Sequence, residues 1–250
     1  MAVGVINCLD RNEWIVKRGG GIGGSDASAV LGLNPYRTKL DIYRDKLHLK
    51  VENTIQTDED FNKPFLEYGT KAEEPLRELF KLDFPELKVL HNANAIFYRK
   101  DKEYMRGSLD GYLIAQEDFD IVSYWRQNQL EETMPVENIK HIKKGMTGIL
   151  EIKTTELFSS YHKEKWNNQV PQNYYIQILH YMNVMSADFA ILKAQIKQVD
   201  KNGVETYQIR HYVFLASEVA DDLVYEEDKI TEFWTENIIP KIEPSLPINL

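Results

Sequence analysis

Residues 148–153 read GILEIK, and this short stretch decides the fold. Apolar residues precede an alternation of charged and apolar side chains, which predicts a β-strand over 148–153. Side chains two apart on a strand share a face and lie about 7 Å apart, so Glu151 and Lys153 would project together. The end of a central strand is where open α/β sheets bind ligands. The alternative is an exposed ion pair on the surface of the strand. About five such acid-x-base triplets are expected by chance at this composition, so the motif alone does not decide between the two interpretations.

A second acid lies upstream, in Ser108-Leu109-Asp110-Gly111. The pattern predicts a hairpin whose strands are Ala95–Arg99 and Tyr104–Ile114, which places Asp110 beside the strand 148–153. Two carboxylates about 4 Å apart repel by roughly 4 kcal/mol at an effective dielectric near 20, and a cation would relieve that. Oxygen ligands suit Mg²⁺, and a nearby ammonium can orient or deprotonate a water. Plain turn chemistry is the alternative for Asp110.

The remaining segments predict helices on a mixed sheet, an α/β or α+β arrangement in a single domain. Gly19–Gly24 reads GGGIGG, either a phosphate-binding loop or a flexible connector, ahead of a short helix from Ser25 to Leu31. Pro75 is expected to kink its helix. The other expected elements are helices over 39–47, 65–82, 172–185 and 217–239, and strands over 189–198 and 205–215 joined by a turn at 201–203.

Composition limits the class of protein. The 250 residues are 43% hydrophobic, and 30 Lys and Arg against 39 Asp and Glu give a net charge of −9. An acidic chain does not coat nucleic acid by bulk attraction, so any DNA contact must be local. The longest apolar run, Tyr212–Ala216, is too short for a membrane span, and Met1–Asp10 does not read as a signal peptide. With Cys8 as its one cysteine, the chain is expected in a reducing cytoplasm.

Five motifs in order resemble the YqaJ-like viral recombinase family, which includes the lambda-type exonucleases. The motifs are Gly23-Gly24-Ser25-Asp26, Gly69-x-x-x-Glu73, Ser108-Leu109-Asp110-Gly111, Glu151-Ile152-Lys153 and Pro171-x-x-Tyr174-x-x-Gln177. The resemblance implies a restriction-endonuclease-like PD-(D/E)XK core, with a mixed central β-sheet flanked by helices, across a single domain of residues 1–250. Leu109 departs from the proline of the family's motif, and an insertion at about 115–147 is longer than expected.

The resemblance also implies roles for the residues. Asp110, Glu151 and the Ile152 carbonyl would bind Mg²⁺, with Mn²⁺ as a substitute, and Lys153 would position or activate the attacking water. Glu73 would support the metal site, with Glu74 as its competitor.

The same resemblance assigns residues around this centre. Gln177 would hydrogen-bond near the nucleophile with Tyr174 in support, and Arg18 and Ser25 would bind the 5′-phosphate of a DNA end. In the insertion, Trp125 with Lys140, Lys143 and Lys144 is either a DNA-facing or partner-binding arm or a simple extended hairpin or surface loop.

The implied activity is that of a Mg²⁺-dependent 5′-to-3′ exonuclease on linear double-stranded DNA that leaves 3′ single-stranded tails for phage-type homologous recombination. The family pattern adds a ring-shaped homotrimer and a single-strand annealing protein as partner, in the bacterial cytoplasm if the chain is phage-encoded, and no membrane. The alternatives are another PD-(D/E)XK nuclease, either an endonuclease or a Cas4-like end trimmer, or a catalytically silent DNA-end-binding protein. Cys8 alone cannot supply the cysteine-bound cluster of the Cas4 type.

Overall fold

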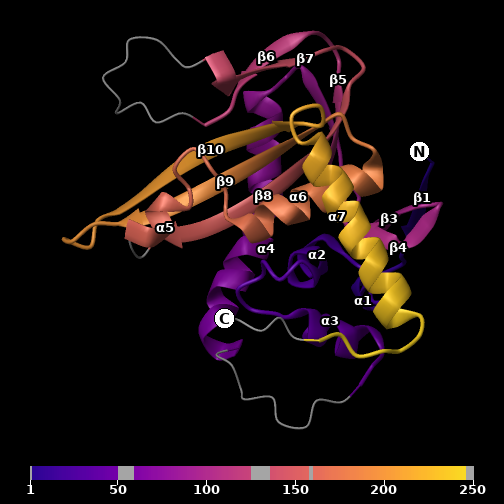
Figure 1. Cartoon of the computed structure of the whole chain (residues 1–250). Helices are drawn as coiled ribbons and strands as arrows, with labels where there is room; N and C mark the ends of the chain where they lie inside the picture. Colours follow the sequence, from indigo (N-terminus) through magenta and orange to yellow (C-terminus); the bar gives the residue numbers. More distant parts are fainter. Residues whose placement is uncertain (1, 50–58, 125–135, 158–159, 246–250) are drawn as a thin grey trace.

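A computed structural model describes residues 2–49, 59–124, 136–157 and 160–245 of the chain. Its centre is a mixed sheet with the strand order β10-β9-β8-β5-β2. β8 and β9 run parallel and the other neighbours antiparallel, so the expected mixed sheet is confirmed (Figure 1). The strands are β2 (Leu87–Leu90), β5 (Gly111–Ala115), β8 (Thr147–Leu157), β9 (Phe189–Val199) and β10 (Glu205–Leu215).

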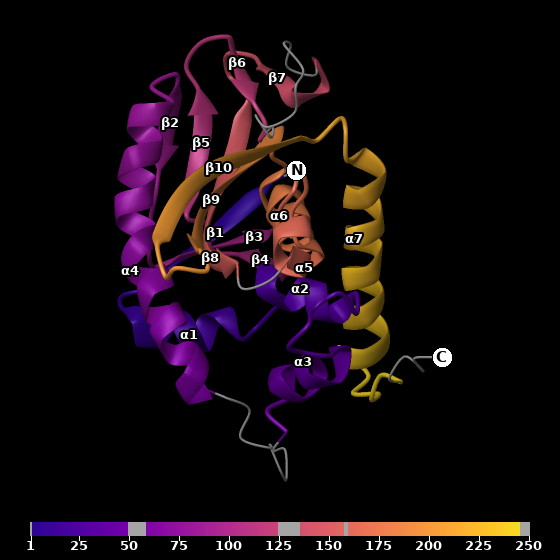
Figure 2. The same cartoon turned by 90° about the vertical axis from the view of Figure 1, so that its left-hand side faces the viewer.

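Helices cover both faces of this sheet because neighbouring residues of β8 point to opposite sides. Leu150 packs in the cluster of Leu76 and Phe80 from α4 (Glu59–Asp83), while Ile149 packs in the cluster of Ile178 and Met182 from α6 (Gln172–Met185). Figure 2 shows α4 on one side of the sheet and α6 on the other. α4 begins before the expected 65–82 and continues as one helix through Pro64 and Pro75.

A second layer of helices packs against α6 and buries a further apolar cluster. It consists of α2 (Gly24–Val30), α3 (Lys39–Lys46) and α7 (Ala220–Phe233), with a π-helical turn over Trp234–Ile238. α7 begins three residues after the expected Ser217, because the amides of Glu218 and Val219 bond to the Leu215 carbonyl in a turn. The end near Ile239 agrees with the expectation.

The expected strand over 104–114 is wrong, because the chain divides there between two sheets. β4 (Lys102–Gly107) belongs to a small sheet of order β1-β3-β4, with β1 (Val3–Asn7) and β3 (Ala95–Arg99), whereas β5 joins the central sheet. The Ser108 hydroxyl donates to the Ala95 carbonyl at 3.1 Å and accepts from Trp14 Nε1 of α1 (Arg11–Arg18) at 3.0 Å. These contacts fix the junction that contains Asp110.

The insertion between β5 and β8 forms a hairpin in its described part, one of the two expected outcomes. β6 (Phe119–Val122) pairs with β7 (Ile139–Ile142), which follows a 3₁₀ turn over Val136–Asn138. Lys140 binds Glu218 at 2.7 Å, while Lys143 and Lys144 are exposed. Trp125 lies outside the described residues. α5 (Ser160–Glu164) follows β8, and in the described ranges no helix has the length and apolar character to cross a bilayer.

Candidate active site

Strand β8 presents the carboxylate and the ammonium expected from its sequence. Glu151 is 2% exposed, and Lys153 Nζ donates to Glu151 Oε1 at 2.5 Å. Both side chains lie just beyond Leu150, the last residue of β8 that pairs with β5. The pair is therefore partly buried where the neighbouring strand begins, and it is not the exposed surface ion pair of the alternative interpretation.

Asp110 occupies the place where β5 would otherwise continue alongside β8. Its Oδ2 accepts a hydrogen bond from the Ile152 amide at 2.7 Å, so the carboxylate takes the main-chain donor that a longer β5 would have bound. On the other side, Arg77 of α4 donates to the Asp110 carbonyl at 3.1 Å. The structure thus brings Asp110, Glu151 and Lys153 together from segments 40 residues apart.

Helix α6 completes this side of the site. Gln177 Nε2 donates to Glu151 Oε1 at 2.6 Å and to Tyr181 Oη at 3.2 Å. The Tyr174 ring centre lies 5.3 Å from Lys153 Nζ, within cation–π range. The face of α6 that carries Tyr174, Gln177 and Tyr181 therefore points at Glu151 and Lys153.

The electrostatics show a surplus of buried acid. Burial raises the pKa of Glu151 to about 8, and the charge of Asp110 adds to this against the opposing effect of Lys153. Burial also raises the pKa of Asp110. Burial alone would lower the pKa of Lys153, but the charges of Glu151 and Asp110 outweigh it and raise that pKa. Lys153 consequently remains an ammonium at neutral pH, while Glu151, with its pKa of about 8, retains its proton there in the absence of a bound ion.

Glu73 faces this centre from α4, and Glu74 does not. Burial raises the pKa of Glu73, and the charge of Asp110 raises it further. Glu74 is exposed to solvent. Of the two candidates, Glu73 is therefore the one placed to act on a bound ion.

The donor set fits a hard divalent cation. The hydrogen bonds described above engage Oδ2 of Asp110 and Oε1 of Glu151, which leaves Oδ1 and Oε2 to turn towards an ion. The Ile152 carbonyl belongs to the same strand edge, since the N–H and C=O of one strand residue face the same neighbour. In the part of the chain that the structure describes, no three His, Cys, Asp or Glu residues could hold a metal by themselves. Two carboxylates, a carbonyl and water match Mg²⁺, which usually keeps several waters.

Arg18 and Ser25, the two residues expected to bind a 5′-phosphate, contact each other. Arg18 Nη2 donates to Ser25 Oγ at 2.8 Å, and the Arg18 guanidinium lies 5.0 Å from the centre of the Trp14 ring. This pair is next to α6, because a Cβ atom added to Gly24 would lie 2.6 Å from the Tyr181 ring and 2.8 Å from Gln177 Cγ. Glycine at position 24 thus lets the loop that holds Ser25 approach the helix that carries Gln177.

Three residues of this region carry no prediction from the sequence. Arg77 is buried beneath Asp110, and Trp14 is held by Ser108. For His91, burial and the charge of Arg77 lower the pKa, so it is neutral at pH 7. The spacing of Arg77, four residues after Glu73 on one helix face, is the signal that could have identified it.

Comparison with solved structures identifies proteins of similar fold. An alkaline exonuclease from Laribacter hongkongensis has a similar structure with a TM-score of 0.53 at 14% identity, over 93% of this chain and 94% of that one. The same exonuclease in complex with dAMP gives a TM-score of 0.52 at 14% identity, over the same shares of the two chains. This likeness places the chain in the PD-(D/E)XK fold class.

Sequence comparison identifies the family. The uncharacterized protein YqaJ of Bacillus subtilis is 25% identical over 244 residues, which are 95% of this chain and 60% of that protein. The chain therefore spans about 60% of the length of this curated relative. The YqaJ-like viral recombinase domain matches residues 13–188, a range that includes every residue of the site described above. The chain belongs to the YqaJ-like viral recombinase domain family.

Proposed function

We propose that the protein is a Mg²⁺-dependent exonuclease that digests linear double-stranded DNA from its 5′ ends and leaves 3′ single-stranded tails for phage-type homologous recombination. The observation that carries this proposal is that Asp110 lies beside Glu151 on the edge of β8, where the Lys153 ammonium donates a hydrogen bond to Glu151 Oε1. A DNA-end-binding protein without activity has no use for two buried acids where a phosphate must lie, since each acid repels it.

In the proposed reaction, Asp110, Glu151 and the Ile152 carbonyl hold the Mg²⁺. When bound, the ion supplies positive charge to the phosphate and lowers the pKa of a water. Lys153 orients that water and stabilises the charge that develops on the phosphate. Without a bound ion, the charges of Glu151 and Asp110 raise the pKa of Lys153 and keep its side chain an ammonium. Gln177 holds Glu151 in place, and Glu73 adds negative charge on the side of α4.

The proposed polarity rests on Arg18 and Ser25, whose guanidinium and hydroxyl suit a terminal 5′-phosphate. Attack of water on phosphorus with departure of the 3′ oxygen releases a 5′-mononucleotide and leaves a phosphate on the next 5′ end. The pocket of Arg18 and Ser25 can then hold this new end. The complex of the Laribacter exonuclease with dAMP, a nucleoside monophosphate, is consistent with such a product.

We further propose that the active form is a homotrimeric ring that encloses the DNA and works with a single-strand annealing protein in the bacterial cytoplasm. Enclosure would retain DNA where the charge of −9 cannot.

One assay tests the proposal. Linear duplex labelled at either end, nicked circle and single strand are incubated with the protein in Mg²⁺, Mn²⁺ or EDTA. We expect loss of the 5′ label as mononucleotide from linear duplex in Mg²⁺ or Mn²⁺, intact circles, and no cleavage in EDTA. Lys153→Ala and Asp110→Ala should abolish digestion, and circular dichroism should show that both variants remain folded.

The other outcomes identify the alternatives. Cut circles would indicate an endonuclease, and trimming that stops near the end would indicate an end trimmer. Binding of ends without cleavage in any metal would indicate a silent DNA-end-binding protein. Undiminished digestion by Lys153→Ala would remove the proposed site.

A further inference from the structure

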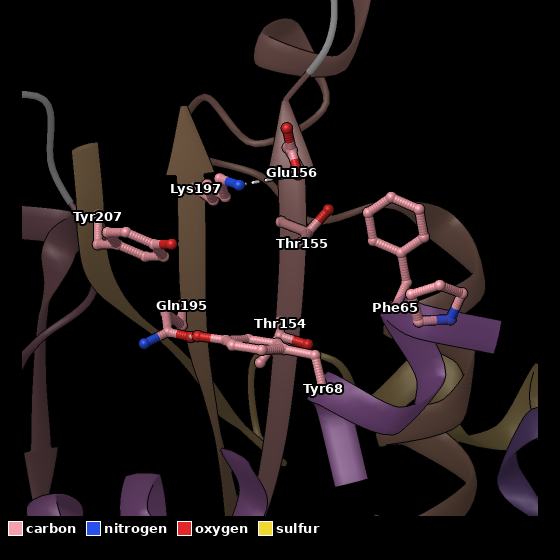
Figure 3. A pocket seen from close by; sticks show the side chains of 9 residues that line it. Phe65, Tyr68, Thr154, Thr155, Glu156, Gln195, Lys197 and Tyr207 are labelled. Carbon is pink, nitrogen blue, oxygen red and sulfur yellow. Dashed lines mark hydrogen bonds and ion pairs between the residues drawn. The ribbon is translucent and has the colours of Figure 1, made fainter. Parts of the chain in front are cut away.

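A groove lies beside the candidate active site and takes no part in the proposed hydrolysis. It encloses about 250 Å³. Its lining includes Phe65, Tyr68, Thr154, Gln195, Lys197 and Tyr207 (Figure 3). We call it the Tyr68 groove. Its volume is below the roughly 300–1,000 Å³ of pockets for whole small-molecule ligands, so it suits a part of a polymer.

The Tyr68 groove shares two elements with the candidate active site, β8 and α4, and lies on the face of the sheet that α4 covers. On β8, Thr154 directly follows Lys153, and Glu156, which also lines the groove, is about 10 Å further along. On α4, Gly69 lies against Thr154, because a Cβ atom added there would be 3.3 Å from its Oγ1. Tyr68 precedes this contact, and Glu73 follows it by one turn. Because side chains alternate along β8, Thr154 and Glu156 point to the face of the sheet that α4 covers, opposite to the side chain of Lys153. The active-site residue on the same side as the groove is Glu73 of α4.

The groove presents aromatic surface to solvent. Tyr68 is 48% exposed and Tyr207 is 53% exposed, on opposite sides of Gln195 in Figure 3. Tyr68 Oη donates to Gln195 Oε1 at 2.7 Å, which fixes the Tyr68 ring and leaves the Gln195 Nε2 on the side away from it (Figure 3). A held ring next to a free amide donor suits a nucleobase, which has a stacking face and polar edges.

The charges in the groove favour a base over a phosphate. Lys197 is the cation of the lining, and its Nζ lies 2.6 Å from Glu205 and 3.6 Å from Glu156. Two acids neutralise one ammonium, so the groove offers no net positive charge to a phosphodiester backbone. A strand seated here would direct its phosphates to solvent and its base inward.

We infer that the Tyr68 groove binds an unpaired nucleotide of DNA by stacking its base on Tyr68 and Tyr207. The inference rests on the proposed function in taking DNA as the ligand, but it does not depend on cleavage. A nucleotide held in the groove would be kept from re-pairing.

The test measures binding in EDTA. Two fluorescent strands of ten units, oligothymidylate and an abasic strand of equal charge, are titrated with the full chain. We expect the wild type to prefer oligothymidylate, and the double variant Tyr68→Ala/Tyr207→Ala to bind it about tenfold more weakly, within the range for loss of base stacking. Abasic binding should not change. Tyr68→Phe keeps the ring and should bind like the wild type, as should Tyr225→Ala, which removes a tyrosine of similar exposure, 57%, from α7.

Three results would overturn the inference. The first is equal affinity of the wild type for oligothymidylate and the abasic strand, and the second is a double variant that still prefers oligothymidylate as strongly as the wild type does. The third is that the affinity difference between the wild type and the double variant disappears in 0.5 M salt, as expected for a phosphate contact. If the groove is instead a protein-docking surface, the double variant binds both strands like the wild type. If the proposed nuclease activity is absent, the duplex stays intact in Mg²⁺ while the protein still prefers oligothymidylate to the abasic strand.

Discussion

Lys153 and Gln177 donate to the same oxygen atom, Oε1 of Glu151, from a strand and from a helix on one face of the sheet. Each donor thus sets the position of the other through the carboxylate between them. Replacing either one changes the orientation of Glu151 as well as removing a side chain.

Gln177→Ala should reduce kcat for DNA digestion about 10- to 100-fold with little change in KM, because such supporting contacts to a metal ligand are worth this much. Single-turnover digestion of a labelled duplex measures the effect. Gln172→Ala, at an exposed position of the same helix, is the matched control. Equal rates for the two variants would show that Gln177 does not position Glu151.

Mg²⁺ should stabilise the protein against heat, and Asp110→Asn should abolish the effect. Binding to the folded state alone adds about 2.7 kcal/mol at one hundred times the dissociation constant. Scanning calorimetry with increasing Mg²⁺ measures this, and Asp228→Asn, an exposed acid of α7, should respond like the wild type. A Tm of Asp110→Asn that still rises with Mg²⁺ would place the ion elsewhere.

Arg18→Ala should reduce the preference for 5′-phosphorylated ends more than it slows cleavage of a bond already in the site. The Arg18 guanidinium donates a hydrogen bond to Ser25 Oγ at 2.8 Å. Without the guanidinium, only the Ser25 hydroxyl would remain to contact the phosphate. Initial rates on duplexes with and without a 5′-phosphate give the ratio. If the variant loses the same factor on both duplexes, the pocket does not read the terminal phosphate.

His180 should make stability depend on pH. Its Nδ1 lies 2.8 Å from Glu226 Oε1, and its Nε2 lies 3.0 Å from the carbonyls of Ile22 and Arg106. Since all three partners are acceptors, both ring nitrogens donate. Burial would lower the pKa of His180, but Glu226 and these hydrogen bonds raise it above the ordinary 6.5.

The folded state therefore binds this proton more tightly than the unfolded chain does. The contribution of His180 to the free energy of unfolding is complete below pH 6.5 and is lost as the pH rises through the raised pKa. Urea unfolding between pH 6 and 9 should show this decline. The double variant His180→Leu/Glu226→Leu, which avoids an unpaired buried charge, should show a flatter profile. An equal slope in both proteins would assign the pH dependence to other groups.

Gly24→Ala should destabilise the protein by about 1–3 kcal/mol, the usual cost of overpacking a tight contact. The added Cβ would meet the Tyr181 ring at 2.6 Å and force α2 away from α6. Chemical denaturation measures the loss. Gly32→Ala is not an equivalent control, because φ at Gly32 is +74° and strains any side chain. No change for Gly24→Ala would mean that the two helices separate at little cost.

Much of the central sheet could be predicted because its signals are local. The turn with Gly203 at φ +79° marks the hairpin of β9 and β10, and Pro171 marks the start of α6. The sharing of one face by Glu151 and Lys153 follows from strand geometry alone. These features need no knowledge of what packs against them.

The rest depends on contacts between distant segments. Gly107-Ser108 and Asp110-Gly111 interrupt the segment 104–114, but nothing local shows that its two halves join different sheets. The contacts of Ser108 with Trp14 and Ala95 show where the strand divides. β1 and β2 have five and four residues and lack a turn signal that would identify them. The spacing of Arg77 from Glu73 places both on one face of α4, but the hydrogen bond of Arg77 to the Asp110 carbonyl joins residues 33 apart in the sequence.

The hairpin of β6 and β7 leaves the central sheet from Ala115 and returns at Thr147, at the ends of β5 and β8 opposite to Asp110 and Glu151. Changes in its length consequently do not alter the spacing of the two acids. The hairpin buries Ile121 and Ile142 in the cluster of Leu76 and Phe80, so a substitution at either of them would lower stability while the two acids keep their positions.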